Sequence, residues 1–317
     1  MVNSTMLFSN MTQLSPISSN LVDDLFYVWF GLFILTLLCF IFFLYFFTEI
    51  LNVYFTTPHV REISRYVLFA HMLINDLLYM IAGLLLCLCA FFKITMPLSI
   101  CYFLLAFSAS TFRITPYNLA AMALERYIAI CFPLRHITFC TAQRSYTVIA
   151  IIWLMGIMPN VADIFVLSSS VESMFFSLCV ICRQDLVKVN SLQTTVQTLS
   201  FIFTLSMVGL TILYTYVKVM LVARKIGSGS SSASKAGKTV MLHAFQLLLC
   251  MVSLTHSVIE SKVNTHVAII RLMNFLIFMC LPRFLSPLIY GIKDEVFSKC
   301  IRKMYALLCK PHLANLK

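Results

Sequence analysis

The stretch "MALERYIAICFPLRH", residues 122–136, places a charged pair inside an otherwise apolar part of the chain. Glu125 and Arg126 stand between the apolar runs Leu119–Leu124 and Ile128–Phe132. A charge in the hydrocarbon layer of a membrane is costly unless it has a partner or reaches water. We therefore predict that this stretch ends a membrane helix, where the long Arg126 side chain extends to the aqueous surface.

The composition indicates a membrane protein. Of the 317 residues, 61% are hydrophobic and 11% are charged, and the mean hydropathy is +0.93, whereas soluble domains carry about 25% charged residues. Seven segments approach the length of about 20 apolar residues that a membrane helix needs, and they are too continuously apolar for barrel strands. The segments are Leu25–Phe47, Tyr66–Phe92, Ile100–Ile128, Tyr146–Val166, Thr194–Val222, Thr239–Ile259 and Val267–Tyr290. We predict an all-α membrane protein with a seven-transmembrane helix bundle.

The basic residues predict the orientation of this bundle. If the N-terminus is extracellular, most Lys and Arg residues fall in inner segments, and the outer segments hold only Lys93, Arg183, Lys188 and Lys262. The positive-inside rule favours this arrangement, with the C-terminus in the cytoplasm. The net charge of +11 is then a topology signal. Because the basic residues share no exposed patch, we expect no nucleic-acid partner.

Three regions follow from this topology. Residues 1–24 are predicted as an extracellular tail, 25–290 as the transmembrane domain and 291–317 as a cytoplasmic segment. Apolar residues at helical spacing in the last region predict a C-terminal amphipathic surface helix. The tail carries glycosylation sequons at Asn3 and Asn10, which are used in the secretory lumen.

Three of the twelve cysteines fall on the extracellular side, where disulfides persist. They are Cys101, Cys179 and Cys182. The Cys179–Cys182 spacing of a CxxC motif has no second ligand pair nearby, so we predict no metal site. We expect a disulfide from one of these two residues to Cys101, with the other left over.

Five charged residues lie within or at the edge of the predicted spans, and such side chains face the bundle interior or a partner. They are Asp76, Arg113, Asp163, Glu260 and Arg283. Arg113 lies about 20 Å along the helix axis from Arg126, too deep to reach water easily. It needs a carboxylate partner or an anionic ligand. We favour an internal partner, Asp163 or Glu260.

Several motifs resemble those of rhodopsin-like (class A) G protein-coupled receptors. They are "LINDLL" around Asp76, the Glu125–Arg126 pair, Trp153 and "SPLIY" at residues 286–290. Within that class, "MALERYIAICFPLRH" resembles the odorant-receptor signature Met-Ala-Tyr-Asp-Arg-Tyr-x-Ala-Ile-Cys-x-Pro-Leu. "KAGKTVMLH" at residues 235–243 resembles a second odorant-receptor motif. "RYVLFAHMLINDLLYM" and "LPRFLSPLIYGIKDEVFSK" are similar to fish-type odorant receptors in particular.

The resemblance implies an odorant receptor of the plasma membrane that binds a small-molecule odorant in the outer half of the bundle. It also implies activation of a heterotrimeric G protein, with membrane lipid as the surrounding solvent and no cofactor. A seven-span transporter or channel is the alternative, although we find no internal repeat of the kind that transporters often contain. An enzyme is not predicted, because HExxH and GxSxG motifs are absent.

The resemblance also implies roles for residues. Leu105, Ser108 and Phe112 share one face of the third span by their spacing, and the family adds that this face lines the ligand cavity. The full set of implied ligand contacts is Leu105, Ser108, Phe112, Arg113, His256 and Glu260. The implied switch and G protein contacts are Glu125, Arg126, Tyr127, Pro133, Tyr214, Tyr216 and Tyr290. Glu125 would hold Arg126 in the resting state. The implied disulfide joins Cys101 to Cys182, with Cys179 as the alternative.

The chain also departs from the family. Val240 stands where the odorant-receptor motif has Cys, and Ser286 stands where the class has Asn. In most class A receptors the acid of the second span faces a sodium site that this Asn helps to form. Arg283 lies three residues before Ser286, on nearly the same helix face. We predict that Arg283 pairs with Asp76 and replaces the sodium ion.

Overall fold

The computed structural model describes residues 15–171, 173–187, 189–225, 241, 245, 248, 275–281, 283 and 284. Most of these residues are helical. Five helices in the described part are long and apolar enough to cross a membrane: α2 (Ser15–Thr56), α4 (Ser64–Phe91), α5 (Leu98–Cys131), α7 (Ala142–Ser170) and α9 (Ser191–Lys225). Each of the first five predicted spans corresponds to one of them. Most extend past the apolar core because backbone hydrogen bonds continue into the polar flanks.

Short elements join or follow these helices. They are α3 (Pro58–Arg61), β1 (Thr95–Pro97), α6 (Pro133–Phe139), η1 (Ser173–Ser177), β2 (Cys179–Ile181), α8 (Gln184–Val187) and η2 (Phe275–Cys280), which is a π-helical turn of the predicted seventh span. In the predicted sixth span, residues 241, 245 and 248 are helical. The rest of these two spans and the predicted C-terminal surface helix lie outside the described residues.

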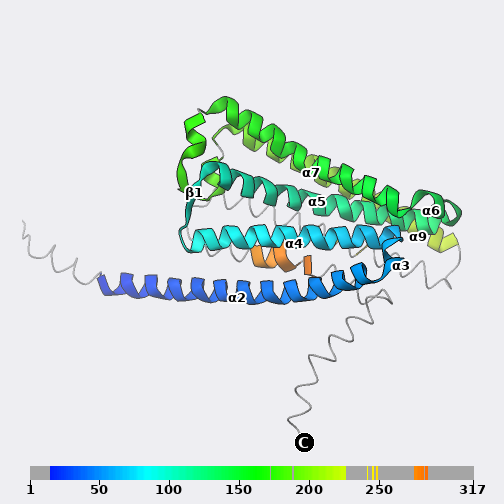
Figure 1. Cartoon of the computed structure of the whole chain (residues 1–317), viewed down its shortest axis with the longest axis horizontal. Coiled ribbons are helices and arrows are strands. Elements are labelled where there is room, and N and C mark those ends of the chain that lie inside the picture. The colour runs from blue at the N-terminus through cyan, green and yellow to red at the C-terminus, as the bar shows by residue number, and fades with distance from the viewer. Residues whose placement is uncertain are drawn as a thin grey trace, which may run out of the picture.

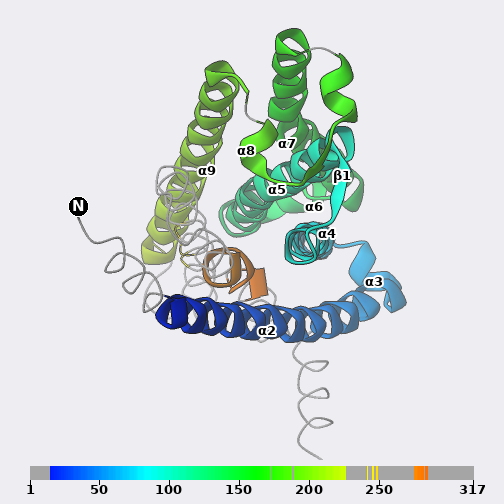
Figure 2. The ribbon, with the colours of Figure 1, turned by 90° about the vertical axis from the view of Figure 1, so that its left-hand side faces the viewer.

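Helix α5 is the central element of the described bundle. It packs against α4, α7 and α9, and Figure 2 shows it between these three helices. In Figure 1 the helices α4, α5 and α7 run lengthwise beside one another, with α2 along the other side of α4. Gly156 lets α7 approach α5 closely, because a Cβ atom there would lie 2.7 Å from Cγ1 of Ile114. Small residues at such contacts bring membrane helices together.

The largest apolar cluster joins α2, α4, α5 and the seventh span. Phe284 of the seventh span inserts among Phe42, Phe43 and Phe46 of α2, with ring centroids 4.6–5.6 Å apart. Tilted aromatic pairs of this kind add to the dispersion attraction between the helices. The seventh span is therefore anchored to α2, directly beside Arg283.

Candidate functional site

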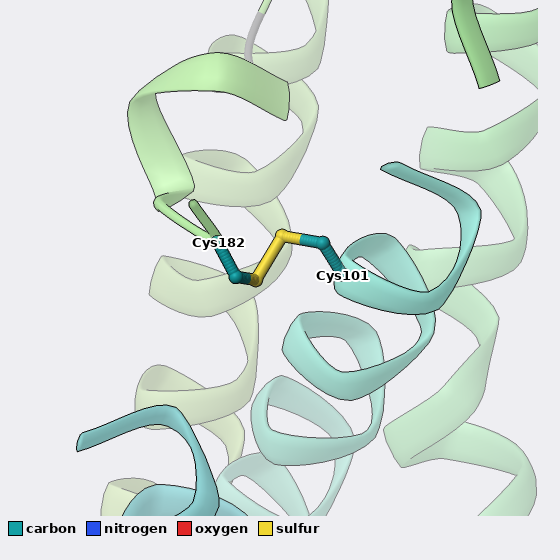
Figure 3. The surroundings of a disulfide bond; sticks show 2 residues. All are labelled: Cys101 and Cys182. Carbon is teal, nitrogen blue, oxygen red and sulfur yellow. A yellow bond between two sulfur atoms is a disulfide. The ribbon is translucent and has the colours of Figure 1, made fainter. Parts of the chain in front are cut away.

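The end of α5 that we predict to be extracellular, called the outer end below, is joined covalently to the segment that follows β2. Cys101, in the first turn of α5, forms a disulfide with Cys182, shown in Figure 3. The antiparallel pairing of β1 with β2 ends immediately before Cys182. The first of the two predicted pairings is present, and Cys179 is an exposed free thiol.

Apolar packing reinforces this junction. Leu98, Cys101 and Tyr102 of α5 form one buried cluster with Leu167, Cys182 and Val187. Leu105, a predicted ligand contact, packs against the cluster and is partly buried. The outer end of α5 is therefore fixed by both a covalent bond and close packing.

An ion pair lies in the interior of the bundle, between α4 and the seventh span. Arg283 Nε is 3.5 Å from Asp76 Oδ1, and the two side chains are 1% and 0% exposed. The Thr115 hydroxyl of α5 donates to Asp76 Oδ1 at 3.0 Å and accepts from Arg283 Nη2 at 3.4 Å. Asn75 Nδ2 also donates to the Thr115 hydroxyl at 3.0 Å. Helix α4, helix α5 and the seventh span thus contribute side chains to one buried polar cluster around Asp76.

Two aromatic rings enclose the Arg283 guanidinium. Its central carbon lies 3.5 Å from the ring centroid of Tyr79 and 5.4 Å from that of Phe112. Phe112 also stacks on Phe201 of α9, with centroids 6.1 Å apart. A guanidinium over an aromatic face is stabilised by the ring quadrupole. The rings therefore connect the predicted ligand face of α5 to the Asp76–Arg283 pair.

Arg113 makes a hydrogen bond that we did not predict, while Asp163, one of its two predicted partners, interacts with it electrostatically at longer range. Arg113 Nη1 donates to Asn160 Oδ1 of α7 at 2.8 Å. Asp163 instead accepts a hydrogen bond from the Tyr102 hydroxyl at 3.2 Å, and this hydroxyl also lies 3.1 Å from the carbonyl oxygen of Asn160. Arg113 and Asp163 thus belong to one buried network but are joined through neutral groups. Glu260, the other predicted partner, lies outside the described residues.

The amide of Asn160 explains this arrangement. Its Nδ2 donates to the carbonyl oxygen of Ala106 at 2.8 Å and to the Ser110 hydroxyl at 2.6 Å, so its oxygen is directed at Arg113. These contacts lie between α5 and α7, whereas Phe112 contacts α4 and α9. Arg113 is therefore not on the face of α5 that carries Phe112.

At the end of α5 that we predict to face the cytoplasm, called the inner end below, Glu125 has two basic neighbours. Arg126 Nε lies 3.9 Å from Glu125 Oε2, and His136 Nε2 of α6 lies 2.9 Å from Glu125 Oε1. The Glu125 side chain is buried, while the Arg126 and His136 side chains are partly exposed. The predicted pair is thus adjacent in space. His136 is a partner that the sequence motif did not reveal.

The other predicted switch residues surround this pair. The Tyr127 ring packs edge-on against Tyr214 of α9, with centroids 5.7 Å apart. Tyr216 is partly buried and packs against the apolar contact of α5 with α9. Pro133 is exposed at the start of α6. His256, Glu260, Tyr290, Asn3 and Asn10 lie outside the described residues.

A second series of hydrogen bonds crosses the interior of the bundle, and the sequence analysis did not predict it. The Trp153 indole N–H donates to His71 Nε2 at 3.0 Å, and His71 Nδ1 lies 3.3 Å from Asn118 Oδ1. Because Nε2 accepts, Nδ1 carries the proton and donates to Asn118. Asn118 Nδ2 in turn donates to the Leu68 carbonyl at 3.1 Å. The sequence does contain a sign of this polar contact, because His71 stands one helical turn before Asn75 in an otherwise apolar span.

Comparison with known proteins identifies the class. The family model described as 7 transmembrane receptor (rhodopsin family) matches residues 48–290 of the chain. Because this match covers more than half of the chain, the chain belongs to the rhodopsin family of seven-transmembrane receptors. It is therefore a multi-pass membrane protein, and the predicted seven-transmembrane class is confirmed.

The relatives that the chain matches include odorant and olfactory receptors. The chain is 31% identical to odorant receptor 131-2 of Danio rerio over 264 residues, which cover 78% of this chain and 79% of that relative. It is 28% identical to olfactory receptor 51E2 of Homo sapiens over 209 residues, 62% of this chain and 63% of that relative. The mouse (Mus musculus) olfactory receptor 51E2 is 27% identical over 205 residues, 60% of this chain and 62% of that relative. The resemblance to odorant receptors is thus confirmed.

Proposed function

We propose that this chain is an odorant receptor that binds a small molecule in the outer half of its bundle and activates a heterotrimeric G protein. The observation that carries the proposal is the inner end of α5, where the partly exposed Arg126 lies 3.9 Å from Glu125 beside the exposed start of α6. A contact of this kind is bistable, because a partner that offers new hydrogen bonds shifts the balance. The odorant-receptor relatives support the same reading.

The ligand face that we propose consists of Leu105, Ser108 and Phe112, together with His256 and Glu260 of the sixth span. Phe112 supports this assignment because it contacts the enclosed Arg283. A ligand that moves the Phe112 ring also disturbs the guanidinium and its contact with Asp76. This gives a physical route from the outer cavity to the centre of the bundle.

We further propose that Arg283 serves as the internal cation of this receptor. The guanidinium is buried beside Asp76, the only acid among the described residues of α4, so a sodium ion there would add a second positive charge. Agonist affinity is expected to be the same in sodium chloride and in potassium chloride of equal ionic strength. A sodium-dependent change in affinity would contradict the assignment.

The test of the function uses membranes from cells that express the receptor, mixed with purified heterotrimeric G proteins. A panel of water-soluble odorants is screened for binding of a non-hydrolysable GTP analogue. We expect at least one odorant to increase binding, and Arg126→Ala to abolish the increase. Arg135→Ala, an exposed cation on α6, is the matched control and retains it. Odorant-driven solute flux without nucleotide exchange would favour a transporter instead.

The orientation and the three regions remain part of this proposal. The N-terminal tail, residues 1–24, is placed outside the cell, the bundle spans 25–290, and residues 291–317 lie in the cytoplasm. Antibody labelling of epitope tags at each end, before and after permeabilisation of the cells, tests this topology. Labelling of a C-terminal tag on intact cells would overturn it.

A further inference from the structure

A small cavity lies between α2, α4 and the π-helical turn η2 of the seventh span. Sulfur-bearing side chains from all three elements line it: Cys39 of α2, Met80 of α4 and Cys280 of η2. Met80 is 2% exposed, Cys280 is 5% exposed and Cys39 is partly buried. Figure 1 shows η2, in orange, between α2 and α4. The fold thus brings three sulfur-bearing side chains, far apart in the sequence, to one cavity.

The packing of the seventh span fixes Cys280 in this position. Four residues beyond it, the Phe284 ring packs on the Phe43 ring of α2, with centroids 4.6 Å apart, and Phe43 also lines the cavity. The Cys280 thiol interacts electrostatically with the thiols of Cys39 and Cys87, so these groups lie near one another. Single π-helical turns occur frequently at functional sites. The position of Cys280 is therefore set by contacts with both neighbouring helices.

The size and the lining of the cavity limit what can occupy it. Its volume is about 10 Å³, roughly the space that one water molecule requires, so an odorant does not fit. A buried water molecule also needs about two to four polar partners. Thr36 is the one hydroxyl-bearing residue among the described lining residues, and its hydroxyl donates to the Leu32 carbonyl at 2.8 Å. The cavity therefore suits a single atom that bonds to sulfur better than to oxygen.

Sulfur ligands select soft metal ions. Thiolate and thioether groups favour Cu(I), whereas carboxylate and carbonyl groups favour Mg²⁺ and Ca²⁺. Within the described part of the chain, no group of three or more His, Cys, Asp or Glu side chains could hold a metal ion. Zn²⁺, which takes four ligands of these kinds, therefore has no site among those residues. Cu(I) and Ag(I) bind with fewer ligands, and the cavity offers two thiols and a thioether.

The charges around the cavity also favour a monovalent ion. Asp76, the acid of α4, is already paired with Arg283, which stands three residues after Cys280. A monovalent ion and one thiolate cancel, so the site stays neutral where an uncompensated charge would be costly. A divalent ion would leave one positive charge close to the Arg283 guanidinium.

We propose that Cys39, Met80 and Cys280 bind one soft monovalent metal ion, Cu(I) or its redox-inert analogue Ag(I). On binding, a sulfur–metal bond forms at one cysteine, its S–H bond breaks and the proton leaves to water. The oxidation state of the metal does not change. The second thiol and the thioether complete the coordination as neutral ligands. The ion holds the seventh span against α2 and α4, beside the buried pair of Asp76 and Arg283.

The experiment measures thermal unfolding of the purified full-length receptor in detergent by tryptophan fluorescence, with and without Ag(I). At a free concentration of about 100 times the dissociation constant, we expect the wild-type midpoint to rise on the order of 5 °C. Cys39→Ala and Cys280→Ala should each lose most of this rise, and Met80→Leu should lose part of it. Cys89→Ala removes a partly buried thiol of α4 that does not line the cavity, and as the matched control it should keep the whole rise.

X-ray absorption of the receptor loaded with Cu(I) tests the ligands directly. We expect sulfur neighbours in the wild type and one fewer bound ion per receptor in Cys39→Ala, with no further loss when Cys280→Ala is added. No rise of the wild-type midpoint, an equal rise in Cys39→Ala and Cys280→Ala, or oxygen and nitrogen neighbours only, would overturn the proposal. Should Cys280→Ala fail to fold, Cys39→Ala and Met80→Leu, on two other helices, still decide it. Because these measurements need neither odorant nor G protein, their failure leaves the proposed receptor function intact.

Discussion

The two ends of α5 are held in different ways. At the outer end, a disulfide to Cys182 and a buried network around Asn160 fix the helix to its neighbours. At the inner end, Arg126 and His136 hold Glu125 while remaining partly exposed to water. Exposed contacts are weak, because water and salt compete with them. They can therefore be exchanged for contacts with a partner at small cost.

The Asp76–Arg283 pair lies between these two extremes. It is ionic, like the inner end, but it is as buried as the outer network. Separating a buried pair leaves uncompensated charges in a medium of low dielectric constant. We conclude that burial, more than charge, decides which contacts of α5 hold the fold and which can switch. The predictions that follow test this division from the largest expected effect to the smallest.

Removing one member of the central pair should have the largest effect. Asp76→Asn or Arg283→Leu leaves a buried charge without its partner, which costs about 3–5 kcal/mol. We expect each variant to lose most of its surface expression, measured by flow cytometry. Glu125→Gln, at the partly exposed pair, is the matched control and should retain it.

The charge swap makes this test specific. Asp76→Arg combined with Arg283→Asp should restore part of the surface expression lost in either single variant. Normal expression of Asp76→Asn and Arg283→Leu would show that the pair is dispensable. The conclusion that buried contacts of α5 hold the fold would then be wrong for this pair.

Loss of the disulfide should come next. Cys101→Ser opens the link between α5 and the residue after β2, and removal of a native disulfide typically costs about 2–5 kcal/mol. We expect a lower midpoint of thermal unfolding in detergent, and Cys182→Ser should behave in the same way. Cys179→Ser, which changes a free and exposed thiol, should leave the midpoint unchanged. If Cys179→Ser lowered the midpoint as much as Cys182→Ser, the pairing would be wrong.

Sequence reasoning predicted the helices well, because lipid imposes a length that apolar runs such as Ile100–Ile128 display directly. It also marked Asp76 and Arg283, since charges within apolar runs need partners. The rings of Tyr79 and Phe112 around Arg283 could not be predicted. Aromatic residues are frequent in this chain, and spacing alone does not select those that meet across helices.

The misses share a physical cause. Arg113 was assigned to an acid, and Asp163 does interact with it electrostatically, but its hydrogen bond to the neutral amide of Asn160 was not foreseen. His136 was overlooked because it meets Glu125 only after the chain reverses at Pro133. Helical periodicity describes neighbours within one element, and it carries no information about contacts made across a turn.

Removing Arg113 should have an intermediate effect. Arg113→Leu breaks the hydrogen bond to Asn160, and a bond to a charged group contributes about 1.5–3 kcal/mol. We expect a lower midpoint of thermal unfolding with little change in agonist potency, because Arg113 faces α7 and not the Phe112 side of α5. Asn160→Leu should lower the midpoint similarly. A large loss of potency at a normal midpoint would instead place Arg113 in the ligand site.

The smallest effect on stability is expected at the two tyrosines of α9. Tyr214 is half exposed beside Tyr127 and Lys218, whereas Tyr216 is partly buried against α5 near Ala120 and Ala123. The Tyr216 hydroxyl is therefore expected to reach a released Arg126, whereas Tyr214 is engaged by the ring of Tyr127 on α5.

Tyr216→Phe should therefore lower the maximal response to an odorant by about fivefold, the scale of one hydrogen bond of roughly 1 kcal/mol. Tyr214→Phe is the matched control and should respond like the wild type. Both variants should unfold at the wild-type midpoint, because each keeps its ring and its packing. The measurement is binding of the GTP analogue at saturating odorant, normalised to surface expression. A loss of response in Tyr214→Phe but not in Tyr216→Phe would reverse the assignment and place the switch at the contact of Tyr214 with Tyr127.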